Sequence, residues 1–251
     1  MGLLALVVTL ALIAPPPSPL TVSAAISLTD VLAVLGPMYT KGGGAPVHFN
    51  YAASNVLARQ IVNGAPVDVF ISADEVQMEI AAAAGAIDPG TRVKLLGNAI
   101  VVARRRGLPN ASSGWIAALR DARSRRIAIG DPEAVPAGVY AKRLLMKEGL
   151  WDELQPKLVP VASVRAALTA VNNGSADAAF VYASDVFSYR GTAIEGVPVG
   201  WAPDLIGIVY PAAVVSSTRH RAEAARFLTF LCGAEAATVF EQHRFKPLRC
   251  K

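Results

Sequence analysis

The sequence lacks the short motifs that mark several common classes of enzyme. It has no Gly-x-Ser-x-Gly nucleophile elbow, no Gly-x-x-x-x-Gly-Lys-Ser/Thr phosphate loop and no Gly-x-Gly-x-x-Gly dinucleotide fingerprint. The glycine run at 42–44 is not followed by Lys-Ser or Lys-Thr, so we interpret it as a flexible loop. No pair of acidic residues stands out as an acid and base couple. These absences argue against an enzyme.

Histidine and cysteine are scarce. The three histidines, His48, His220 and His243, do not have the spacing of metal ligands, and we expect no cofactor. The two cysteines, Cys232 and Cys250, form no Cys-x-x-Cys motif. In an oxidising compartment they could pair and hold the C-terminal tail, and two free thiols are the alternative.

Only the N-terminus carries a nearly unbroken apolar run, over residues 2–14, and a proline-rich stretch at 15–19 ends it. A run of about a dozen residues is too short to span a bilayer, which takes about 20. It fits the core of a secretory signal, although no Lys or Arg precedes it. We predict a leader over residues 1–19 and a periplasmic location. A buried N-terminal strand or helix is the alternative.

The composition is that of a globular protein with a net positive charge. Of 251 residues, 53% are hydrophobic and 17% are charged, so the chain can bury a sizeable core. The formal net charge of +5 is compatible with nucleic acid, a membrane surface or a small anion as a binding partner. The tightest basic groups, at 104–106 and 123–126, are not interleaved with aromatic residues. We interpret them as solvated charges and expect no nucleic acid partner.

Strand and helix patterns alternate along the chain, which is typical of an α/β fold. We expect strands at 21–26, 47–51, 67–71, 99–103, 126–129, 159–161, 178–181 and 212–215. We expect helices from residue 31 and at 56–62, 76–84, 115–122, 139–148, 164–172, 221–231 and 234–243. The pattern predicts two lobes joined by crossing strands, each a mainly parallel sheet flanked by helices. Lobe 1 comprises 20–97 plus 209–251, and lobe 2 comprises 98–208.

Small or polar residues recur where a predicted strand leads into a helix. Ser27, Ser54, Ala137 and Val164 stand at four such junctions, divided between both halves of the chain. In an open parallel sheet these junctions gather at the carboxyl ends of the strands, where ligands bind. Helix N-termini present unpaired N–H groups and partial positive charge, which suits an anion. Each serine alone could be an ordinary helix cap, so the prediction rests on their recurrence.

A site built from N–H and O–H donors, without Lys or Arg, predicts a fully deprotonated oxyanion as ligand. A pocket of donors without acceptors rejects an anion that keeps a proton, because an O–H group facing a donor leaves both unsatisfied.

Several blocks of sequence carry a more specific likeness. They are 24–30 (AAISLTD), 57–61 (LARQI), 64–74 (GAPVDVFISAD), 95–98 (LLGN), 130–142 (GDPEAVPAGVYAK), 164–168 (VRAAL) and 181–185 (VYASD). In this order they resemble the periplasmic molybdate-binding proteins of ABC importers, which have the type II periplasmic-binding-protein fold. The resemblance covers about residues 21–246.

The resemblance implies a solute-binding protein that captures molybdate, and also tungstate, and delivers it to the membrane permease of an ABC importer. We expect a monomer. The positions that match the family's oxyanion contacts are Ser27, Ser54, Ala137, Val164 and Tyr182. They would hold the metal through the oxygens of molybdate, Ala137 and Val164 through their backbone. Asn55 stands where many relatives carry a second serine.

Three other functions stay open. The first is a binder of sulfate or another tetrahedral oxyanion. The second is an enzyme on the same fold, which would need a reactive side chain in the cleft, whereas both cysteines lie in the C-terminal segment. The third is the sensor domain of a regulator, but no helix-turn-helix segment is visible and the apolar leader indicates export.

Overall fold

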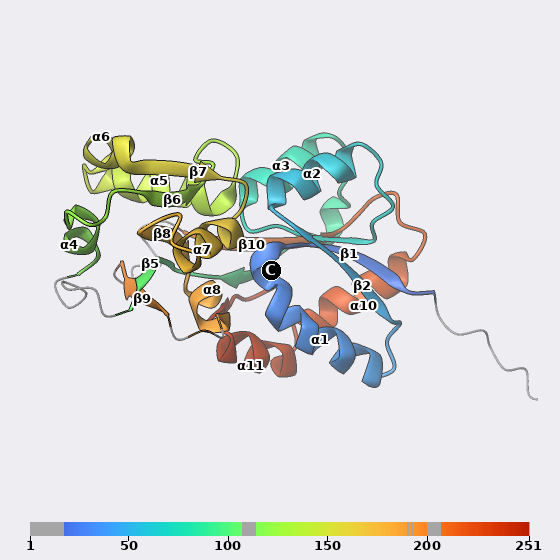
Figure 1. The fold of residues 1–251 in the computed structure, drawn as a ribbon. Helices are drawn as coiled ribbons and strands as arrows, with labels where there is room; N and C mark the ends of the chain where they lie inside the picture. Colours follow the sequence, from blue (N-terminus) through green and yellow to red (C-terminus); the bar gives the residue numbers. More distant parts are fainter. Residues whose placement is uncertain (1–17, 107–113, 190, 192, 200–206, 251) are drawn as a thin grey trace, which may run out of the picture.

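The computed structural model describes residues 18–106, 114–189, 191, 193–199 and 207–250. Two β-sheets, each flanked by helices, form two lobes (Figure 1). The predicted leader, 1–19, lies outside the described residues except for its last two positions. Within the described part of the chain, no helix has the length and apolar character needed to cross a membrane.

The first lobe contains the sheet with strand order β11-β4-β10-β3-β1-β2. Its strands are β1 (Leu20–Ala25), β2 (Val47–Ala52), β3 (Val69–Ile71), β4 (Val93–Gly97), β10 (Val209–Val214) and β11 (Lys246–Pro247). Its helical segments are η1 (Ile26–Leu28), α1 (Thr29–Lys41), α2 (Ser54–Val62), α3 (Glu75–Ala83), η2 (Pro89–Thr91), α10 (Arg221–Leu231) and α11 (Ala234–Gln242).

The second lobe contains the sheet with strand order β7-β6-β8-β5-β9. Its strands are β5 (Ile100–Arg105), β6 (Ile127–Gly130), β7 (Leu158–Val161), β8 (Ala178–Tyr182) and β9 (Ile194–Pro198). Its helical segments are α4 (Trp115–Arg120), α5 (Pro136–Lys147), α6 (Trp151–Leu154), η4 (Gln155–Lys157), α7 (Val164–Asn172) and α8 (Ala183–Ser188).

Both sheets are mixed, where the sequence predicted mainly parallel ones. β1 is parallel to β2 and β3, and β6 is parallel to β7 and β8. In contrast, β10 runs antiparallel to β3 and β4, and β5 runs antiparallel to β8 and β9. The antiparallel strands β5 and β10 are those with which the chain enters the second lobe and returns to the first. The two-lobed α/β fold is confirmed.

Helix α7 illustrates how closely the local sequence specifies an element. Its buried residues are Val164, Ala167, Leu168 and Val171, which lie on one face of a helix. The Oγ of Ser163 accepts a hydrogen bond from the backbone N–H of Ala166 at 3.1 Å and caps the first turn. The helix ends two residues before a glycine at 174 that has a positive φ of 80°. The helix has the bounds that the sequence predicted.

A disulfide joins Cys232 to Cys250, which resolves the two alternatives left open by the sequence. Cys232 follows the last residue of α10, and Cys250 lies just beyond β11. The bond therefore holds the C-terminal segment against the first lobe, where β11 pairs with β4.

Candidate functional site

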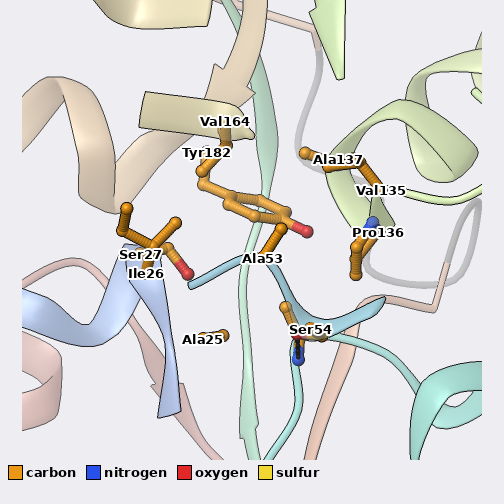
Figure 2. Close-up of a pocket in the computed structure, with 11 residues that line it drawn as sticks. Ala25, Ile26, Ser27, Ala53, Ser54, Val135, Pro136, Ala137, Val164 and Tyr182 are labelled. Atoms are coloured by element: carbon orange, nitrogen blue, oxygen red, sulfur yellow. Dashed lines mark hydrogen bonds between the residues drawn. The ribbon is translucent and has the colours of Figure 1, made fainter. Parts of the chain in front are cut away.

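Helix starts from both lobes converge on one pocket. The pocket is lined by small, apolar and hydroxyl residues, namely Ala25, Ile26, Ser27, Ala53, Ser54, Ala73, Val135, Pro136, Ala137, Val164 and Tyr182 (Figure 2). All of the positions predicted to contact an oxyanion are among them. Four helical segments begin here, η1, α2, α5 and α7, and the first N–H groups of a helix have no acceptor within it.

The first lobe contributes Ser27 and Ser54. Ser27 lies in η1 directly after β1, and Ser54 is the first residue of α2, shortly after β2. These strands are adjacent and parallel, with Ala25 paired to Ala52, so their carboxyl ends lie at the same edge of the sheet. Both serines are buried, with exposed fractions of 3% and 1%. The pattern of strand, polar junction and helix therefore brings both serines to the same pocket.

The second lobe contributes Ala137 and Val164, which stand near the starts of α5 and α7. Their preceding strands β6 and β7 are also adjacent and parallel. Pro136 is the first residue of α5, where its missing N–H is not needed. Gly138 then packs so tightly that an added Cβ would lie 1.9 Å from the carbonyl oxygen of Gly130. This contact fixes the start of α5 against the end of β6.

Tyr182 ends β8 and points its hydroxyl into the pocket, between Ser27 on one side and Ala137 on the other (Figure 2). The side chain is 1% exposed, and its hydroxyl has no hydrogen-bond partner among the described residues. Burial raises the pKa of Tyr182 well above its ordinary value, so the phenol keeps its proton. A buried, protonated hydroxyl without an acceptor is suited to donate to a ligand.

Both serine hydroxyls have partners behind the pocket. The Oγ of Ser54 accepts a hydrogen bond from the backbone N–H of Ala73 at 2.9 Å. The Oγ of Ser27 lies 3.0 Å from the hydroxyl of Tyr210, on β10. Sequence reasoning missed Tyr210, because it precedes a proline and the predicted strand began after that proline.

Among the described residues that line the pocket, none has a charged side chain. Arg165, next to Val164, is engaged by the carboxylates of Asp30 at 2.6 Å and Asp185 at 2.7 Å. Asn55 does not line the pocket, and its Oδ1 is buried without a hydrogen-bond partner in the described part of the chain. Among the described residues, no cluster of His, Cys, Asp and Glu could hold a metal ion directly. The pocket thus offers neutral donors and helix N-termini, which favour an anion.

Comparisons with known proteins agree with this architecture. The molybdate-binding protein ModA of Escherichia coli is 38% identical, over 90% of this chain and 88% of that protein. The structure of the periplasmic molybdate-binding protein of Azotobacter vinelandii is similar with a TM-score of 0.77 and 28% identity, over 90% of this chain and 98% of that one. The sulfate-binding protein SubI of Mycobacterium tuberculosis also has a TM-score of 0.77, over 92% of this chain and 88% of that one, but its 18% identity shows the fold alone.

The sequence model for bacterial extracellular solute-binding proteins matches residues 20–246. This match spans both lobes and every residue that lines the pocket. The chain therefore belongs to the family of bacterial extracellular solute-binding proteins.

Proposed function

We propose that this protein captures molybdate between its two lobes and delivers it to the permease of an ABC importer. The observation that carries the proposal is the pocket itself, a set of hydroxyls and helix starts from both lobes with no charged side chain. The name of the relative that is 38% identical supports molybdate as the ligand. Tungstate has nearly the same size and charge, and we propose it as a second ligand.

In the proposed complex, the anion bridges the lobes 20–97 plus 209–251 and 98–208. Ser27 and Ser54 donate through their hydroxyls and adjacent N–H groups, and Tyr182 donates through its phenol. Ala137 and Val164 donate through backbone N–H groups at the starts of α5 and α7. We further propose that the protein is a monomer, that the leader at 1–19 exports it to the periplasm, and that the closed form presents the surface that the permease binds.

Titration calorimetry with molybdate, tungstate, sulfate and phosphate tests the proposal. We expect one molybdate per chain and much weaker binding of sulfate. Sulfate is the main rival, because the fold is shared with a sulfate-binding protein. If sulfate binds as tightly as molybdate, the proposed ligand is wrong, and if any ligand is turned over, an enzyme is indicated.

A double variant, Ser27→Ala with Ser54→Ala, tests the site. Each hydrogen bond to a charged group contributes about 1.5–3 kcal/mol, so we expect the affinity for molybdate to fall by roughly 100-fold or more. Ser124→Ala is a matched control. It also removes a buried serine hydroxyl, which donates to the carbonyl oxygen of Ala118 at 2.7 Å, but Ser124 does not line the pocket. Unchanged affinity in the double variant would remove both serines from the site.

A further inference from the structure

A chain of hydrogen bonds leads from the segment that joins the lobes to the pocket. Asn98 lies between β4 and β5, where the chain crosses from the first lobe to the second. Its side-chain amide contacts the hydroxyl of Tyr210 at 3.2 Å, and that hydroxyl lies 3.0 Å from the Oγ of Ser27. Neither Asn98 nor Tyr210 lines the pocket, so both act behind the residues that face the ligand.

The orientation of the Asn98 amide follows from its own neighbours. Its Oδ1 accepts a hydrogen bond from the backbone N–H of Ala99 at 2.8 Å. The Nδ2 therefore faces the hydroxyls of Ser184, at 2.9 Å, and Tyr210. The reversed amide would place an NH₂ group against the N–H of Ala99, which is unfavourable. The amide is thus a donor toward Tyr210.

Tyr210 must then donate to Ser27. A phenol carries a single proton, and the amide NH₂ of Asn98, its other hydrogen-bond partner among the described residues, can only donate and cannot accept that proton. Tyr210 is fully buried, and burial raises the pKa of its hydroxyl, so the phenol keeps that proton. The Oγ of Ser27 is the acceptor within reach, at 3.0 Å. With its oxygen occupied by Tyr210, Ser27 has its own proton left for the pocket.

Ser54 reaches the same state by a different route. Its Oγ accepts from the backbone N–H of Ala73 at 2.9 Å, and a backbone N–H can only donate. Both serines therefore have an oxygen that already accepts a hydrogen bond and a proton free for a ligand. For Ser54 the backbone fixes this direction, whereas for Ser27 two side chains do so and can be changed by substitution.

We propose that Tyr210 and Asn98 are specificity-determining residues that fix the proton of Ser27 toward the ligand. The inference deepens the proposed function and rests on it. A serine fixed as a donor stabilises a fully deprotonated oxyanion and opposes one that keeps a proton, such as hydrogen phosphate, because two facing protons leave both groups unsatisfied. Released from Tyr210, the Ser27 hydroxyl can rotate and accept that proton.

The test is Tyr210→Phe, which keeps the ring contacts with Tyr182 and Phe245, at centroid distances of 5.8 and 5.6 Å, and removes only the hydroxyl. Dissociation constants for molybdate and sulfate are measured by calorimetry at pH 7, and that for phosphate by competition. The preference is the ratio of two affinities, that for molybdate or sulfate, whichever binds more tightly, and that for phosphate. We expect this preference to fall about tenfold, which corresponds to one hydrogen bond of about 1.4 kcal/mol. Tyr39→Phe is the matched control. It removes another buried hydroxyl, which donates to Glu223 at 2.6 Å away from the pocket, and should leave the preference unchanged.

A double-mutant cycle separates a positioning role from a general structural one. If Tyr210 acts through Ser27, then Tyr210→Phe changes the preference in the wild-type background but not in a Ser27→Ala background. An equal change in both backgrounds, or no change in either, overturns the inference. If Tyr210→Phe does not fold, Asn98→Ala is the second variant. We expect it to lower the preference over phosphate as well, but by a smaller factor. If the wild type binds sulfate in place of molybdate, the proposed ligand is wrong. The inference about Tyr210 can still be tested, because the preference for sulfate over phosphate is then measured instead.

Discussion

The guanidinium of Arg165 lies 2.6 Å from the carboxylate of Asp30, and this ion pair joins the two lobes. Asp30 is in the first turn of α1, whereas Arg165 is the second residue of α7 and directly follows the pocket residue Val164. On its other side, Arg165 holds the fully buried carboxylate of Asp185 at 2.7 Å. One side chain therefore links the two lobes beside the pocket and compensates a buried charge.

Asp30→Asn should weaken the link between the lobes with little effect on folding. Both partners are partly exposed, at 24% and 34%, so we expect a loss of less than about 1 kcal/mol in the free energy of unfolding. Because the pair bridges the lobes, molybdate should dissociate several-fold faster, as measured by stopped flow. Arg165→Met provides the contrast. It leaves Asp185 buried without its partner, and we expect it to destabilise the fold by about 3–5 kcal/mol. Equal effects of both variants on stability would contradict this division of roles.

Asp185 should make the stability depend on pH in a defined window. Burial raises the pKa of its carboxyl to about 6, against the opposing effect of Arg165, whereas an unfolded aspartate titrates near 3.9. Between about pH 4 and pH 6 the folded protein therefore holds a proton that the unfolded chain has released, and the contribution of this group to stability falls as the pH rises. Relative to Asp185→Asn, the wild type should lose about 2–3 kcal/mol of unfolding free energy from pH 4 to pH 7. Denaturant titrations across this range measure the difference. If the difference in unfolding free energy between the wild type and Asp185→Asn stays constant with pH, the carboxyl titrates alike in the folded and unfolded states. Asp152→Asn, at an exposed position, is the control.

Gly138→Ala should displace the start of α5. The added methyl group would lie 1.9 Å from the oxygen of Gly130 and 2.7 Å from that of Asp131, and both contacts are with backbone. We expect a loss of about 1–3 kcal/mol or more in stability and weaker binding of molybdate, because the N–H groups at the start of α5 move. Thermal unfolding and calorimetry measure the two effects. At Gly90 the same change meets only the carboxylate of Asp88 at 3.5 Å, so Gly90→Ala should be close to neutral. A neutral Gly138→Ala would mean that α5 shifts without consequence.

Reduction of the Cys232–Cys250 disulfide should lower stability and leave binding intact. The bond closes a loop with a sequence separation of 18, which corresponds to about 3 kcal/mol in the chain-entropy model. Neither cysteine lines the pocket, so the affinity for molybdate should be unchanged. Denaturant titrations with and without reductant measure the effect, and a Cys232→Ser, Cys250→Ser variant should no longer respond to reductant. A large loss of affinity on reduction would link the tail to the pocket.

Four of the five predicted oxyanion contacts stand next to a recognisable local signal, so the sequence could predict that they lie together. Ser27, Ser54, Ala137 and Val164 lie where a strand pattern changes to a helix pattern, and parallel neighbouring strands bring such junctions to one edge. Tyr182 depended on the family resemblance, because an aromatic residue at the end of a strand has no distinguishing pattern of its own.

The residues behind the pocket could not be predicted in the same way. The sequence placed the start of the strand near 212, after Pro211, since proline cannot donate to a strand pair. The structure begins β10 at Val209 and accommodates the proline with a register shift between Tyr210 and Pro211 against β4. The contact between Tyr210 and Ser27 spans 183 positions in the sequence, and no local pattern reports such a pairing. Strands β4 and β9 and helix α8 were missed because they are only five or six residues long, and β9 contains Gly196 and Pro198, which are uncommon within a strand.

In the proposed complex, the division of the pocket between two lobes makes it a chelating site. Each lobe alone offers only part of the donor set, and the second lobe would bind an anion that the first already holds, at a high effective concentration. In the proposed complex no pocket side chain needs to change its charge for the anion to leave. A transporter that pulled the lobes apart would convert one multidentate site into two weak ones. Mechanical separation is then sufficient to release the cargo, without a proton or a competing ion.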